Sequence, residues 1–147
     1  MKNQILNILN KTLPKQCFIV VKEYKGCLGT NYIKILFAAS DKLINNVSGQ
    51  YPQVVSLSFN LDSFKLSPQM YAGCGHRVIY REPNLNDPSE KYLAMKGIKI
   101  PFRTPQRSEK NILSAIERFA NNWIKALKEN KETLCYKDLV NYDELLK

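Results

Sequence analysis

The sequence predicts a single α+β domain over residues 1–147, with one antiparallel or mixed sheet of about four strands and an N-terminal and a long C-terminal helix packed on one face. Two patterns lead to this fold class. Apolar and polar residues alternate over Val54–Phe64, which is typical of a strand with one buried and one solvated face. Apolar residues recur at steps of three and four over Ile112–Leu127, which is typical of an amphipathic helix. The chain length suits one ordinary domain.

Local signals predict the elements before the alternating strand. Ile and Leu fall at helical spacings in residues 1–13 and Pro14 follows, so we expect an opening helix. The β-branched and aromatic runs Gln16–Tyr24 and Asn31–Ser40 flank a glycine-containing loop, which predicts a β-hairpin. Asp41 is expected to cap a short helix after the hairpin.

The second half of the chain carries weaker signals until its last helix. The run His76–Glu82 predicts a fourth strand after a glycine-containing turn. Glycine and two prolines in residues 91–107 oppose a continuous helix, so we expect a short strand or a loop there. Ser108 is expected to cap the longest helix, and Glu132–Lys147 to supply a short final helix.

The composition favours an anionic partner. The chain has 22 Lys and Arg against 13 Asp and Glu, a formal charge of +9. A surplus of this size in a small domain attracts polyanions, so nucleic acid is the favoured partner and an acidic protein is a possible one. The same surplus argues against a protein that mimics DNA.

The sequence contains no stretch that suggests a membrane partner. No window approaches the roughly 18 apolar residues of a membrane span, and "MKNQILNILNK" lacks the apolar run of a signal peptide. We therefore expect a soluble, cytoplasmic protein, located in the host cytoplasm if a phage encodes it.

The cysteines and the only histidine give no clear catalytic or metal signature. The four cysteines form no Cys-x-x-Cys pair, so we expect reduced thiols, no metal and no cofactor. Cys74 and His76 lie two residues apart, about 7 Å along a strand, which favours packing over a hydrogen-bonded dyad. We expect no enzymatic activity, and the alternative is a small enzyme or metal site centred on these two residues.

Two cationic features are candidate nucleic-acid contacts. Arg77 and Arg81 share one side of their expected strand, and Tyr32 and Lys34 share one side of another. On neighbouring strands they would form an open surface suited to single-stranded nucleic acid, with an ordinary solvated face as the alternative. The second feature is a basic arm that could follow a phosphate backbone or be a plain surface loop. Its cations are Lys91, Lys96, Lys99, Arg103, Arg107 and Lys110.

The first 40 residues carry a further pattern: a helix closed by an apolar residue and proline, an aromatic and valine strand, and a glycine-bearing hairpin. The residues concerned are Leu13, Pro14, Phe18, Val20, Gly26 and Gly29. This pattern resembles the start of a small domain that accompanies the large polyvalent proteins of phages and conjugative elements. In that family the first position is Phe, the glycines are adjacent and the second strand has a Trp. The resemblance implies a mobile-element origin and a DNA-handling context, and carries over no catalytic residue.

Together these observations predict a basic nucleic-acid-binding accessory protein of phage or mobile-element origin. Its contacts would come from Tyr32, Lys34, Arg77, Arg81 and the basic arm. The alternative is a phage-type inhibitor or interaction protein that binds an acidic host protein or a charged small ligand.

Overall fold

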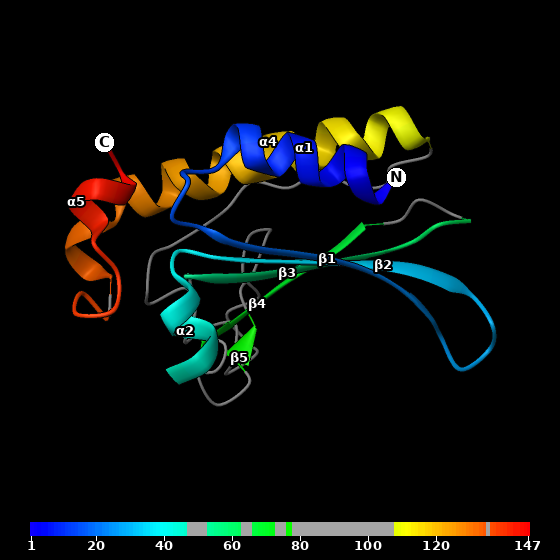
Figure 1. Ribbon diagram of the computed structural model, residues 1–147, viewed down its shortest axis with the longest axis horizontal. Helices are drawn as coiled ribbons and strands as arrows, with labels where there is room; N and C mark the ends of the chain where they lie inside the picture. The colour runs from blue at the N-terminus through cyan, green and yellow to red at the C-terminus, as the bar shows by residue number, and fades with distance from the viewer. Residues whose placement is uncertain (47–52, 63–65, 73–75, 78–107, 135) are drawn as a thin grey trace, which may run out of the picture.

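The computed structural model describes residues 1–46, 53–62, 66–72, 76–77, 108–134 and 136–147. These residues form a sheet with two long helices on one side and shorter helices beside it (Figure 1). The elements are α1 (Lys2–Thr12), β1 (Phe18–Lys25), β2 (Asn31–Ala38), α2 (Asp41–Asn46), β3 (Val54–Asn60), β4 (Leu66–Ala72), β5 (His76–Arg77), α4 (Glu109–Glu129), the 3-10 turn η1 (Lys131–Thr133) and α5 (Tyr142–Leu145).

The sheet is an antiparallel meander. Its five strands lie in the order β1-β2-β3-β4-β5, and each pairs antiparallel with the next. In the register, Tyr24 lies opposite Tyr32, and Lys34 lies between Lys22 on one side and Ser58 on the other. The predicted α+β fold class with one sheet is therefore confirmed.

Helices α1 and α4 cover one face of this sheet (Figure 1). Phe37 of β2 shows how the layers meet, because its ring contacts Phe119 and Trp123 of α4 at centroid separations of 6.2 and 4.9 Å. Val55, Leu57 and Phe59 of β3 are also buried beneath the helices, as the alternation in this strand predicts. The apolar face of the sheet thus forms the core with the two helices from the ends of the chain.

Helix α4 begins and packs as its sequence predicts. The Ser108 side chain accepts a hydrogen bond of 3.2 Å from the Asn111 backbone N–H, which satisfies one of the free donors of the first turn. The expected apolar stripe is buried throughout, including Phe119 and Trp123. At the other end, the Asn130 amide donates to the Ala126 carbonyl at 2.7 Å. None of the helices in the described ranges is long and apolar enough to cross a membrane.

Three details differ from the sequence-based expectation. Asp41 is the first residue of α2, and Ser40 occupies the cap, since its hydroxyl accepts a hydrogen bond from the Lys42 N–H at 3.2 Å. Strand β4 was not predicted, because Pro68 lies in its middle and proline is depleted inside strands. The expected strand His76–Glu82 is present as β5 at its first two residues, and the rest lies outside the described residues.

Candidate nucleic-acid interface

The face of β1, β2 and β3 opposite α1 and α4 carries the candidate interface, and we call it the outer face. Side chains alternate along a strand, and directly paired residues of neighbouring strands share a face. Ile33 and Ile35 are buried toward the helices, so Tyr32 and Lys34 point the other way. The outer-face residues of the three strands with described side chains are Phe18, Val20, Lys22, Tyr24, Tyr32, Lys34, Leu36, Ala38, Val54, Ser58 and Asn60.

Two exposed lysines lie directly opposite each other on the outer face. Lys22 of β1 pairs with Lys34 of β2, and both side chains are exposed. Neither lysine forms an ion pair with any residue that the structure describes. The nearby Glu23 belongs to the other side of β1, by alternation. Like charges directly opposite each other destabilise a sheet, so this pair favours an external anion.

An aromatic pair lies next to the lysines, toward the end of the hairpin. The rings of Tyr24 and Tyr32 are stacked, with centroids 5.4 Å apart and an interplanar angle of 16°. The Tyr24 hydroxyl and the Ser58 hydroxyl lie 3.1 Å apart in a hydrogen bond that reaches from β1 to β3. The Tyr24 side chain remains 43% exposed. The sheet therefore holds an ordered aromatic surface that water can reach.

The loop that joins β1 to β2 is a closed turn. The Gly26 N–H donates to the Thr30 carbonyl at 2.8 Å, and the Gly29 N–H donates to the Gly26 carbonyl at 2.9 Å. Gly29 has φ +79°, a conformation that glycine adopts without the steric cost of a side chain. The hairpin extends past the ends of α1 and α4 (Figure 1), and Leu28 at its tip is 96% exposed.

The structure places only part of the predicted site. Tyr32 and Lys34 lie together on the outer face of β2. Arg77 is in β5, which lies three strands from β2, about 14 Å across the sheet, so the expectation that these residues stand on neighbouring strands is wrong. Lys110 of the basic arm is an exposed residue in the first turn of α4. The other predicted residues lie outside the described residues: Arg81, Lys91, Lys96, Lys99, Arg103 and Arg107.

Lys22, Tyr24 and Ser58 of the outer face were not predicted from the sequence. The positions of Lys22 and Tyr24 follow from the predicted hairpin and its glycine-containing loop. A loop over residues 26–30 pairs Lys25 with Asn31, and counting back along both strands pairs Tyr24 with Tyr32. Ser58 could be found only with the pairing of β3 to β2, which does not follow from local sequence.

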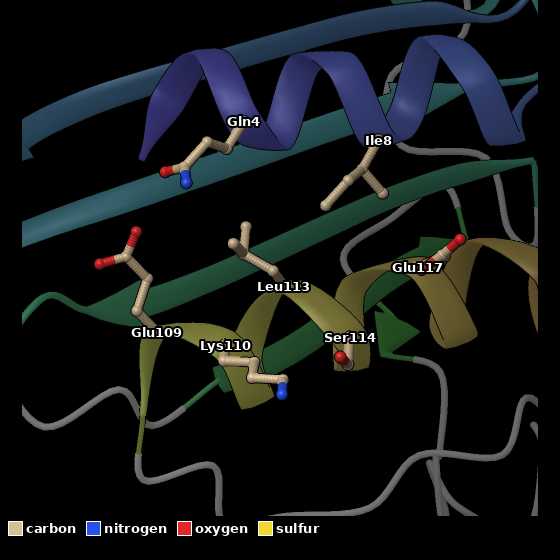
Figure 2. Close-up of a pocket in the computed structure, with 7 residues that line it drawn as sticks. All are labelled: Gln4, Ile8, Glu109, Lys110, Leu113, Ser114 and Glu117. Atoms are coloured by element: carbon tan, nitrogen blue, oxygen red, sulfur yellow. The ribbon is translucent and has the colours of Figure 1, made fainter.

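Two cavities elsewhere on the molecule mix charges of both signs. A groove of about 440 Å³ lies between α1 and the start of α4, where Ile8 and Leu113 point toward each other (Figure 2). The other residues that line it are Gln4, Glu109, Lys110, Ser114 and Glu117. With two carboxylates and one lysine, this groove does not favour a phosphate.

The second cavity, of about 520 Å³, lies near the C-terminus. It contains an ion pair between Lys131 and Asp143, which raises the pKa of the lysine and lowers that of the carboxyl. Three lysines line it together with three carboxylates: Lys42, Lys131, Lys137, Glu132, Asp138 and Asp143. The charges balance, so the outer face is the more cationic surface.

The cysteines that the structure describes differ in environment. Cys17 is partly buried, and burial raises the pKa of its thiol to about 12, which makes it a poor nucleophile at neutral pH. Cys27 is exposed in the hairpin loop. Cys74 lies outside the described residues, so the Cys74 and His76 hypothesis stays a prediction. Among the residues with described positions, no group of three or more potential ligands could hold a metal ion.

No protein family, curated protein or solved structure matches the chain. The resemblance of the first 40 residues to the phage-associated domain therefore stays a prediction.

Proposed function

We propose that this protein is a nucleic-acid-binding accessory protein and that the outer face of β1–β3 is its contact surface. The observation that supports this most is the stacked pair Tyr24 and Tyr32 beside the opposed lysines Lys22 and Lys34. Aromatic rings stack on bases, and lysines neutralise phosphates. The mobile-element origin suggested by the first 40 residues suits this role and is part of the proposal.

The distance between the lysine pair, Lys22 and Lys34, and the tyrosine pair, Tyr24 and Tyr32, fits a single strand of nucleic acid. The lysine pair and the tyrosine pair are two residues apart along each strand, about 7 Å. One nucleotide can therefore place its base on Tyr24 and its phosphate near a lysine. Unpaired bases offer their faces to such a surface, whereas the bases of a duplex are already stacked on each other. We expect tighter binding of single-stranded than of double-stranded oligonucleotides.

The test compares two variants with the same change in charge. Lys22→Gln/Lys34→Gln alters the outer face, and Lys125→Gln/Lys128→Gln alters exposed lysines of α4. Binding to labelled oligonucleotides is measured by fluorescence polarisation at about 50 and about 200 mM salt. The outer-face variant should bind more weakly, and its slope of log affinity against log salt should fall by about 1.4, as two lost phosphate contacts require. The α4 variant should stay close to the wild type.

Two results would contradict the proposal. An equal loss of oligonucleotide affinity in both double variants would show that net charge alone drives binding. Wild-type protein that binds polyglutamate in a salt-dependent manner and binds no oligonucleotide would favour the acidic-protein partner instead. A Tyr24→Ala variant adds a readout that charge does not affect, since one lost base stack should weaken binding by about tenfold.

A further inference from the structure

Leu28 is the most exposed large apolar side chain that the structure describes. It is 96% exposed at the tip of the β1–β2 hairpin, whereas the other leucines and isoleucines with described side chains are buried or partly buried. A single exposed apolar residue is common on protein surfaces. The backbone conformation of this loop, however, keeps Leu28 at the exposed tip of the hairpin.

The backbone of the loop around Leu28 is held by hydrogen bonds. Two backbone hydrogen bonds close the loop, from Gly26 to Thr30 and from Gly29 to Gly26. Gly29 takes up the positive φ that the return of the chain requires. Leu28 therefore projects from a closed turn, and little backbone entropy is lost when it contacts a ligand.

Leu28 lies on the same hairpin as the tyrosine pair of the proposed binding surface. Leu28 follows Tyr24 by four residues on the same ribbon, a span of about 10 to 13 Å. Bases stacked at about 3.4 Å intervals cover this span in three to four steps. A nucleic-acid strand held at Tyr24 can thus reach the tip of the hairpin.

We propose that Leu28 is an apolar wedge that enters between adjacent bases of the nucleic acid bound on the outer face. This inference rests on the nucleic-acid binding proposed above and adds a local unstacking of the bound strand. Leucine is one of the side chains that proteins insert between base steps, where the apolar group replaces one base-to-base contact. The cations beside the hairpin favour a polyanion, and one leucine is too small to anchor a protein in a lipid bilayer.

The experiment separates binding from unstacking. An adenine-rich single strand carries 2-aminopurine, whose fluorescence rises when it leaves the stack, and an end label that reports binding by polarisation. With wild-type protein, both signals should rise. Leu28→Ser should bind about tenfold more weakly and, at saturation, leave the 2-aminopurine signal at its free-strand level. Leu28→Met keeps an apolar tip and should restore both signals.

Cys27→Ser is the matched control, because it changes an exposed neighbour in the same loop. It should behave as the wild type. Leu28 makes little contact with the fold, so the melting temperatures of all variants should agree.

If Leu28→Ser binds and raises 2-aminopurine fluorescence like the wild type, the wedge is wrong while nucleic-acid binding stands. If the wild type raises neither signal, the proposed function fails, and the wedge with it. Leu28-dependent sedimentation with phosphatidylglycerol vesicles and no 2-aminopurine response would replace the wedge by lipid contact.

Discussion

The backbone of Gly26 lies so close to the ring of Tyr32 that a Cβ added at Gly26 would stand 2.8 Å from the ring Cε2 atom. A Gly26→Ala substitution therefore has to move the ring. The ring is the outer end of a rotatable side chain, so the free energy of unfolding should fall by less than about 1 kcal/mol. The stack of Tyr32 on Tyr24 should be lost, which the loss of ring-to-ring contacts in NMR spectra would show.

Gly29→Ala is the control for this prediction. A Cβ at Gly29 meets nothing within 4 Å, but the residue has φ +79°. Alanine there should lower the free energy of unfolding by about 1 kcal/mol through backbone strain while the tyrosine stack stays intact. Ring contacts that survive in Gly26→Ala, or vanish in Gly29→Ala, would contradict this account.

Removing one of the opposed lysines should affect stability and binding in opposite directions. Lys34→Gln relieves the repulsion from Lys22, so the free energy of unfolding should rise by a few tenths of a kcal/mol at low salt. Oligonucleotide affinity should fall, because a phosphate contact is lost. Urea unfolding and polarisation on the same preparation test both. A variant that loses stability as well would show that Lys34 has a structural role.

Trp123 should be among the most important residues for stability. It is fully buried, and its ring lies 4.9 Å from that of Phe37. Trp123→Ala should cost about 3 to 5 kcal/mol, since it removes a large apolar side chain and leaves a cavity. Trp123→Phe keeps an aromatic ring in the same place and should cost much less. Urea unfolding followed by circular dichroism measures both values, and equal losses would contradict the cavity argument.

The N-cap of α4 can be tested with a pair of serines. Ser108→Ala removes the acceptor for the Asn111 N–H and should cost about 1 kcal/mol, or about 3 °C in Tm. Ser114→Ala changes an exposed serine within the same helix, where alanine is the better helix former, so Tm should stay or rise slightly. A drop of similar size in both variants would speak against the capping role.

Cys17 should react slowly with alkylating reagents until the pH is high. Burial raises the pKa of its thiol to about 12, so at pH 8 only about one molecule in 10⁴ carries the reactive thiolate. Its alkylation rate, followed by mass spectrometry, should increase about tenfold per pH unit above pH 8. In urea-unfolded protein, Cys17 should react rapidly at pH 8. Fast reaction in the folded protein would show that the thiol is not buried.

The same pKa shift makes stability depend on pH. The folded protein keeps the Cys17 thiol protonated, whereas the unfolded chain releases this proton above a pKa of about 9. The associated stability is complete below pH 9 and is lost as the pH rises toward 12. Relative to Cys17→Ala, the wild type should therefore lose about 1 kcal/mol per pH unit in this range.

The sequence predicted which faces of the helices and strands are buried better than it predicted which strands pair with each other. Alternation alone identifies Val55, Leu57 and Phe59 as the buried side of β3, and helical spacing identifies the stripe of α4. Both are local patterns. Strand β4 lacks such a pattern and contains Pro68, so local propensity pointed away from the strand that pairing with β3 stabilises.

The same difference between local patterns and long-range pairing explains which residues of the candidate site were predicted. Tyr32 and Lys34 lie on one strand, so alternation placed them together correctly. Their relation to Lys22 and Ser58 depends on strand register, and the distance of Arg77 depends on the order of strands in the sheet. Register and order are set by contacts between distant segments, which a single sequence does not display.

The helical layer combines one helix from the start of the chain with one from its last third. During synthesis, β2 and β3 leave the ribosome well before α4 does. Until α4 emerges, Phe37 lacks the aromatic neighbours that complete its burial, and the apolar side of the sheet is open to other chains. A chain halted before Glu109 should therefore bind chaperones and aggregate, whereas the finished chain covers this surface itself.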